Sequence, residues 1–159
     1  MKIRLVKGSD YYLISPLIND WWGGRQISGK LPKLFFDHFS STSFIAEKED
    51  EMIGFLIGFL SQTHPNEAYI HFAGVHPEYR KHHVGKQLYD EFFHAAKQNG
   101  RSIVRCITSP VNKGSIAFHT RMGFEIEAGN KEEAGVSVHA DYDGANQDRV
   151  LLVKTITHL

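Results

Sequence analysis

The chain has 159 residues, 42% of them hydrophobic and 12% aromatic, which is enough for one buried core. Eighteen basic residues balance eighteen acidic ones, so net charge gives no reason to expect a nucleic-acid partner or an anionic membrane surface. A single cysteine excludes an internal disulfide, and the sequence contains neither a signal peptide nor an apolar run long enough to span a bilayer. We therefore expect one cytoplasmic domain over residues 1–159, and a homodimer is compatible with the sequence.

The first third of the chain predicts a strand at residues 3–6 and a helix that begins near Tyr11 with Asp10 as its cap. A turn at residues 21–25 precedes a second helical segment at residues 31–39. Two strands, at residues 43–47 and 52–60, flank a charged turn and predict a β-hairpin. Gly54 and Gly58 in the second of these strands indicate bulges or close packing by a neighbouring element.

The remainder alternates between strands and helices. Strand-favouring residues at 68–75 precede a helical pattern that begins at Val84 and ends at Asn99 and Gly100. A strand around Cys106, a helix capped by Asn112, a strand from Phe124, a polar loop and a last strand at residues 149–156 follow. Early antiparallel strands and later strand–helix alternation predict a mixed α+β fold, with a mostly antiparallel central sheet and helices on both faces.

A cationic turn at the start of the second-half helix is the most informative segment. Arg80, Lys81 and Lys86 crowd a helix N-terminus, where exposed N–H groups already favour an anion. This pattern indicates a phosphate site. A P-loop is excluded because Arg80 stands in place of its first glycine and Gln87 in place of its hydroxyl residue, and a dinucleotide fingerprint is excluded because Gly85 is the turn's only glycine.

The turn resembles the acyl-CoA signature of the GNAT superfamily of N-acetyltransferases, Val-x-Pro-x-x-Arg-x-x-Gly-x-Gly/Ala followed by a helical leucine. The positions that match in register are Val75, Pro77, Arg80, Gly85 and Leu88. His83 departs from the signature because it takes the place of the first glycine. The turn must therefore reach its backbone conformation with a side chain present.

A second block, at residues 112–124, resembles the later motif of the same superfamily, Asn-x-x-Ala/Ser-x-x-Phe/Leu-Tyr-x-x-x-Gly-Phe. Asn112, Ser115, Phe118 and the pair Gly123-Phe124 match it. His119 stands where the family often has a tyrosine that acts as the general acid toward the departing thiolate.

The resemblance implies an N-acetyltransferase that moves an acetyl group from acetyl-CoA to a primary amine by direct attack in a ternary complex. Carried over position by position, it implies that the cofactor contacts Ala73, Gly74, Val75, Arg80, Lys81, His83, Val84, Gly85, Lys86, Asn112, Ser115 and His119. A non-catalytic acyl-CoA sensor or interaction module is the alternative, because His83 and His119 depart from the family pattern.

The reaction needs a base, since a primary amine is mostly protonated at neutral pH. Glu67, Tyr69 and His71 share one face of a regular strand, and Glu67 and His71 remain alternative bases. His119 is the candidate acid. The histidines lack the spacing of a metal site, so no metal is expected.

The acceptor is the least constrained part of the prediction. Trp21 and Trp22 are candidates for lining a substrate pocket. Asp141 and Asp143 belong to an acidic segment before the last strand, which would attract a positively charged amine. We therefore expect a small cationic acceptor, with a peptide amine left open.

Overall fold

The computed structural model of the protein, which describes residues 1–156, has a seven-stranded sheet with the order β1-β2-β3-β4-β5-β9-β6. The strands are β1 (Lys2–Leu5), β2 (Phe44–Lys48), β3 (Glu51–Leu60), β4 (Glu67–Val75), β5 (Ile103–Thr108), β6 (Glu125–Ile126) and β9 (Val150–Thr155). Among the described strands, only β4 and β5 pair in parallel. A separate hairpin consists of β7 (Lys131–Glu133) and β8 (Val136–Val138).

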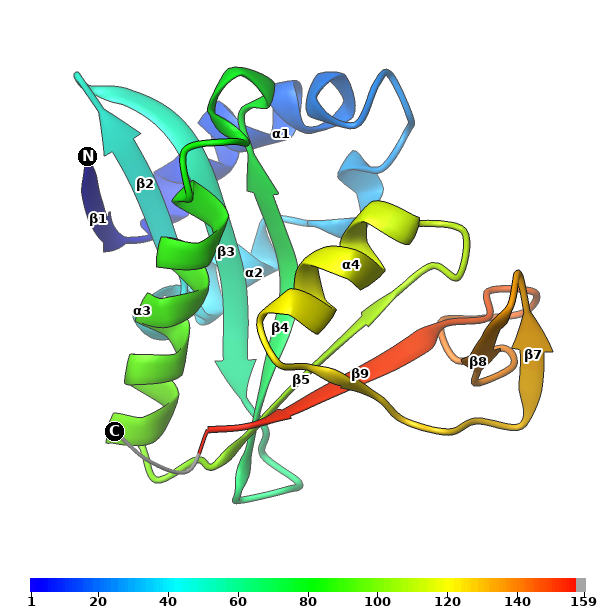
Figure 1. The fold of residues 1–159 in the computed structure, drawn as a ribbon. Helices are drawn as coiled ribbons and strands as arrows, with labels where there is room; N and C mark the ends of the chain where they lie inside the picture. The colour runs from blue at the N-terminus through cyan, green and yellow to red at the C-terminus, as the bar shows by residue number, and fades with distance from the viewer. Residues whose placement is uncertain (157–159) are drawn as a thin grey trace.

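Four α-helices cover the two faces of the sheet: α1 (Tyr11–Trp21), α2 (Leu34–His38), α3 (Val84–Gln98) and α4 (Lys113–Arg121). In Figure 1, α3 and α4 lie in front of the strands, while α1 and α2 lie behind them. Side chains of β3 alternate between the two layers. Leu56 packs with the α3 side chains, whereas Phe55 and Ile57 pack with α1 and α2.

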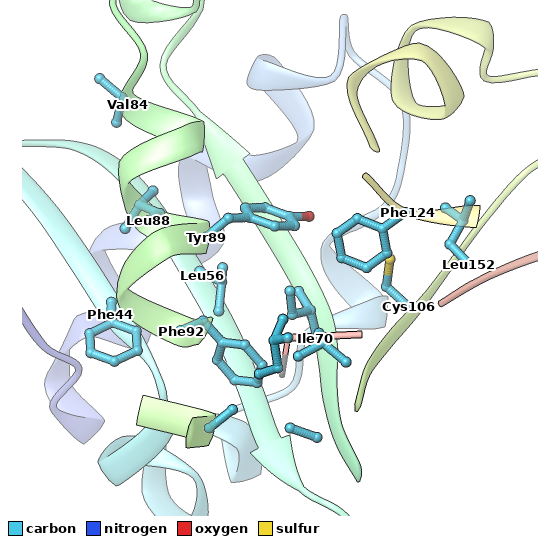
Figure 2. Close-up of a cluster of buried hydrophobic side chains, with 14 of the residues drawn as sticks. Phe44, Leu56, Ile70, Val84, Leu88, Tyr89, Phe92, Cys106, Phe124 and Leu152 are labelled. Atoms are coloured by element: carbon cyan, nitrogen blue, oxygen red, sulfur yellow. The ribbon is translucent and has the colours of Figure 1, made fainter. Parts of the chain in front are cut away.

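The core beneath α3 is built by apolar residues at helical spacing (Figure 2). Val84, Leu88 and Phe92 are almost fully buried against the sheet. Tyr89, next to this stripe, points its ring toward Phe124 and the end of α4. The helix therefore anchors its N-terminal turn rigidly above the sheet.

The register of β3 against β4 shifts at Gly58, one of the two glycines that indicate a bulge or close packing. Ile57 pairs with Phe72 and Gly58 pairs with Ile70, so His71 is the extra residue of β4. Close packing also occurs there, because a Cβ on Gly58 would lie 2.3 Å from the Phe92 ring. The bulge and the close packing that the glycines indicate are therefore both present.

The central strands diverge beyond this point. β4 pairs with β5 only from Glu67 to Tyr69, opposite Ile103 to Arg105. Further along, β4 continues to Val75 and β5 to Thr108 without a ladder between them among the described residues. The opening between these strands leaves a backbone edge of β4 available to a ligand.

The predicted fold class is confirmed, and three local expectations were wrong. Asp10 precedes α1, but its carboxylate binds Arg4 and the Lys7 amide instead of capping the helix. The second helical segment is an α-helix only over Leu34–His38. The polar loop before β9 contains the β7–β8 hairpin, whose turn residues Ala134 and Gly135 both have positive φ.

No helix within residues 1–156 has the length and apolar character needed to cross a membrane.

Candidate active site

A groove of about 1480 Å³ occupies the opening between β4 and β5. It runs from the N-terminus of α3 to the loop between α1 and α2 on the other face of the sheet. Most of the residues expected to contact the cofactor line it: Ala73, Gly74, Val75, Arg80, Lys81, His83, Gly85, Lys86, Asn112, Ser115 and His119. The Val84 side chain is instead buried under α3, which leaves only its backbone toward the turn.

The cationic turn ends at His83, which has φ 59° and ψ 20° and serves as the N-cap of α3. This left-handed conformation is the one that glycine would adopt without strain, so the departure from the family signature is accommodated at a conformational cost. The first N–H groups of α3 have no intrahelical acceptors. Lys81 and Lys86 lie beside these N–H groups, and Lys86 pairs with Asp90 at 2.8 Å.

Arg80 joins three elements around the turn. Its Nη2 donates to the Trp21 carbonyl at the end of α1, and its Nε donates to the Val75 carbonyl at 3.3 Å. The guanidinium thus fixes the end of α1 against the end of β4. Its remaining N–H groups are available to an anion in the groove.

The α3 and α4 helices approach closely at Gly85. A Cβ on Gly85 would lie 3.3 Å from Cζ of Phe118, so little more than a methyl group fits between the helices there. Asn112 begins α4 as expected, because its side chain accepts the Ser115 amide at 3.1 Å.

His119 is buried, with an exposed fraction of 6%. Its Nδ1 lies 2.8 Å from the Ser115 carbonyl, and its Nε2 lies 2.9 Å from the Tyr89 hydroxyl. A carbonyl only accepts, so in the neutral ring Nδ1 carries the proton and Nε2 accepts from Tyr89. Burial lowers the His119 pKa below its ordinary value, and it raises the pKa of Tyr89 well above its own.

His71 presents the opposite tautomer to the groove. Its Nε2 lies 2.7 Å from the Lys30 carbonyl and must carry the proton, which leaves the Nδ1 lone pair unprotonated. The ring stacks on Phe35 with 4.0 Å between centroids. Burial lowers the His71 pKa. The ring is therefore neutral near pH 7 and retains a basic nitrogen.

Glu67 and His71 share a face of β4 as expected, because Glu67, Tyr69 and His71 are half-buried while Ala68 and Ile70 between them are buried on the other face. Oε1 of Glu67 accepts from Nε of Arg105 at 2.9 Å, and Glu67 lines a smaller cavity beside the groove. The distance along the strand therefore places the two base candidates in different spaces. Tyr69, between them in sequence, lines both spaces.

The two tryptophans differ in exposure. Trp21 is only 5% exposed and packs against Phe55 and His76, although it borders the groove. The Trp22 ring lies directly over Gly74, where a Cβ would come within 2.6 Å of it. Trp22 therefore forms the wall of the groove that faces β4.

The acidic segment is largely paired within the chain. Asp143 lines the groove, but it also forms ion pairs with Lys30 at 3.6 Å and Arg149 at 3.3 Å. The Asp141 carboxylate accepts the Asn146 amide and so orders its own loop. Asp143 is thus the member of this segment that the fold places near His71, whose pKa it acts to raise.

Several residues near the site carried no sequence signal. Tyr89 is separated from its partner His119 by 30 positions, and Lys30 contributes a backbone carbonyl that any residue could supply. Arg105 lies in β5, and Glu127 lies just after β6. Only a correct prediction of how these elements pack would have brought such residues together.

Comparison with known proteins identifies this arrangement. Residues 13–124 match the acetyltransferase (GNAT) family. The chain belongs to that family. This confirms the resemblance drawn from the two motifs, and the matched family is one of acetyltransferases. An uncharacterized N-acetyltransferase of Methanocaldococcus jannaschii is 34% identical over 86 residues, which cover 52% of this chain and 38% of the relative. The chain thus matches well under half of that relative's length.

Solved structures share the fold of this GNAT chain. Ard1 from Thermoplasma volcanium superposes with a TM-score of 0.80 at 18% identity, covering 99% of this chain and 98% of its own. A putative acetyltransferase, yncA from Salmonella typhimurium, was solved with its cofactor acetyl-CoA and superposes with a TM-score of 0.71 at 16% identity, covering 100% of this chain and 95% of its own. Together with the family, this second structure supports the predicted cofactor.

Proposed function

We propose that the protein transfers the acetyl group of acetyl-CoA to a small cationic primary amine by direct attack in a ternary complex. The observation that carries the proposal is one continuous groove with an anion site at its α3 end and the unprotonated Nδ1 of His71 at the other. An acyl donor and an amine acceptor can therefore meet at the opening between β4 and β5.

The cofactor end fits a pyrophosphate group. Backbone N–H groups at the start of α3 and the side chains of Lys81 and Lys86 would bind it, while Arg80 holds the turn against α1. The free edge of β4 from Ala73 to Val75 would hold the pantetheine arm. When bound, acetyl-CoA supplies the acetyl group from its thioester, and coenzyme A leaves as the free thiol.

His71 is the better supported of the two base candidates. Its Nδ1 can accept a proton from the attacking amine, directly or through a water, while Nε2 stays hydrogen-bonded to the Lys30 carbonyl. The pKa lowered by burial keeps this nitrogen unprotonated at neutral pH. Glu67 is committed to Arg105 and faces the smaller cavity, so it has a binding role in this proposal.

His119 serves with Tyr89 at the thiol end. In each cycle Nε2 of His119 would take up a proton from water in the groove, because Nδ1 already carries its proton toward Ser115. The Tyr89 hydroxyl can then accept from Nε2 and turn its own proton toward the groove, which both residues line. The pair would thus deliver one proton to the departing sulfur, with Tyr89 as the donor and His119 as its supply.

A thiol-release assay with acetyl-CoA and a panel of amines tests this function. We expect steady release with at least one small cationic amine, and about a hundredfold or greater loss of kcat in His71→Gln. His94→Gln, an exposed histidine on α3, is the matched control and should retain activity. No release with any amine would overturn transfer, and an active His71→Gln enzyme would overturn His71 as the base.

A further inference from the structure

A second cavity, with a volume of about 430 Å³, lies at the other end of β4 from the cationic turn. Its walls come from β3, β4, β5, β9 and the segments that follow β6 and β8. Tyr69, Cys106 and Ile107 line both this cavity and the groove, so the two spaces adjoin. The cavity has no part in the transfer chemistry described above.

Its charged residues carry a net negative charge. Arg105 donates from Nε to Glu67 Oε1 at 2.9 Å and from Nη1 to Glu127 Oε1 at 2.7 Å. Two carboxylates against one guanidinium leave one negative charge when the neighbouring histidines are neutral. Each carboxylate gives Arg105 only Oε1, which leaves the lone pairs of Oε2 to other donors.

His139 also borders this cavity. Its Nε2 is buried and has no hydrogen-bond partner among the described residues. The nearest carboxylate oxygen, Oε2 of Glu127, is 3.8 Å away, which is too far for a hydrogen bond. This oxygen can therefore accept from a donor that enters the cavity.

Aromatic rings border the same space. Phe59 stacks on Tyr69 with 5.2 Å between centroids, and Tyr142 contacts His139 edge to face at 6.2 Å. Ring faces attract organic cations. The free oxygens of two carboxylates and the aromatic walls together favour an alkylammonium group over an anion.

The distance between this cavity and the part of the groove near Ala73, where the acetyl group would be transferred, follows from the register of β4. Arg105 lies in register with Tyr69, four residues before Ala73 on β4. At about 3.3 Å per residue, and allowing for the bulged residue, the two sites are roughly 10 Å apart along the strand. A flexible chain with an amine at each end can occupy both.

We propose that this cavity binds the distal ammonium group of a linear diamine or polyamine whose other amine is acetylated in the groove. The distal group would donate to Oε2 of Glu127 and to Oε2 of Glu67. This inference rests on the proposed function and makes Glu127, in place of the paired acidic loop, the main partner of the acceptor's charge.

Kinetics with matched acceptors test the proposal. Linear diamines of increasing length are compared with monoamines of the same chain length, which lack the distal charge. We expect wild-type kcat/KM to favour the diamine, with an optimum length, and Glu127→Gln to reduce that preference roughly tenfold. Glu125→Gln, at an exposed position of β6 two residues before Glu127, should leave the preference unchanged. Equal use of diamine and monoamine by the wild-type enzyme would overturn the inference while leaving acetyl transfer intact.

A binding measurement makes the test independent of turnover. Calorimetry of the CoA-loaded protein with the best diamine should show roughly tenfold weaker binding in Glu127→Gln, with melting temperature used to verify folding. Glu127→Lys should reverse the preference toward amines that carry a distal carboxylate. Unchanged diamine affinity in Glu127→Gln, or no diamine binding by the wild-type protein, would overturn the site even if no amine proves to be acetylated.

Discussion

At the scale of single residues, the two histidines beside the groove differ in tautomer because each has one carbonyl partner. The Lys30 carbonyl requires the proton on Nε2 of His71, whereas the Ser115 carbonyl requires it on Nδ1 of His119. A nitrogen-detected NMR spectrum near pH 7 should therefore show opposite tautomers for these two rings. Finding the same tautomer in both would contradict the proton path that we propose.

The same histidines should titrate below the ordinary value of about 6.5, because burial disfavours their charged forms. The unfolded chain then binds protons near pH 6.5 that the folded protein still excludes, so the free energy of unfolding should fall as pH drops through that value. Denaturant titrations at pH 7 and pH 5.5 measure this loss. His119→Gln, which cannot titrate, should show a smaller difference between the two pH values.

At the scale of elements, the start of α3 depends on a backbone conformation that costs free energy. His83 has φ 59°, a region in which an L-residue is about 1–2 kcal/mol less stable than in a right-handed helix. Glycine adopts it freely but loses more entropy on folding. His83→Gly should therefore keep or raise stability, by up to about 1 kcal/mol, and preserve acetyl-CoA binding.

His83→Val is the contrasting variant. A β-branched side chain fits poorly at positive φ, so this change should lower the melting temperature and weaken the turn. If valine and glycine prove equivalent, the N-terminus of α3 does not require the left-handed residue that the structure places there. Differential scanning fluorimetry of the two variants decides between these outcomes.

The elements that sequence predicted well are those with local signals. The strand, turn and helix from residue 67 to 98 combine alternation, a cationic turn and 3.6-residue spacing, and the Asn112 cap is a single-residue signal. The β7–β8 hairpin was missed because Lys131–Glu133 is polar throughout and its turn is Ala134-Gly135. The position of Asp10 before a helical pattern predicts a cap. Its actual partner, Arg4, lies on β1, and this contact has no local signal in the sequence.

At the scale of the whole molecule, the site depends on how the sheet opens. The sequence motifs predicted both walls of the groove, but the position of the opening follows from where β4 stops pairing with β5. Glu67 and His71 share a face of β4, but they lie four residues apart and line different spaces, which alternation alone cannot reveal. The position of the opening along β4 therefore decides which of the two base candidates faces the groove.

A ligand held between β4, β5, α3 and α4 should stabilise the whole fold, because it joins these elements where β4 and β5 no longer pair. At a hundred times its dissociation constant, acetyl-CoA would add about 2.7 kcal/mol, which corresponds to a melting-temperature rise of roughly 5–10 °C for a chain of this size. ATP and NAD should give no comparable rise, since the turn lacks their fingerprints. A rise with a nucleotide but none with acetyl-CoA would contradict the cofactor.

Gly85 lies both at the cofactor turn and at the contact between α3 and α4, so its replacement can affect binding and folding. Alanine there would place its Cβ 3.3 Å from Phe118, which a small shift accommodates, whereas leucine would force α3 and α4 apart or fill the cofactor's path along the turn. Gly85→Ala should therefore retain most of the acetyl-CoA shift and Gly85→Leu should lose it. Comparing the ligand-free melting temperatures of the two variants separates damage to the fold from loss of binding. A Gly85→Leu protein that melts like the wild type and still shows the full shift would place the cofactor away from the start of α3.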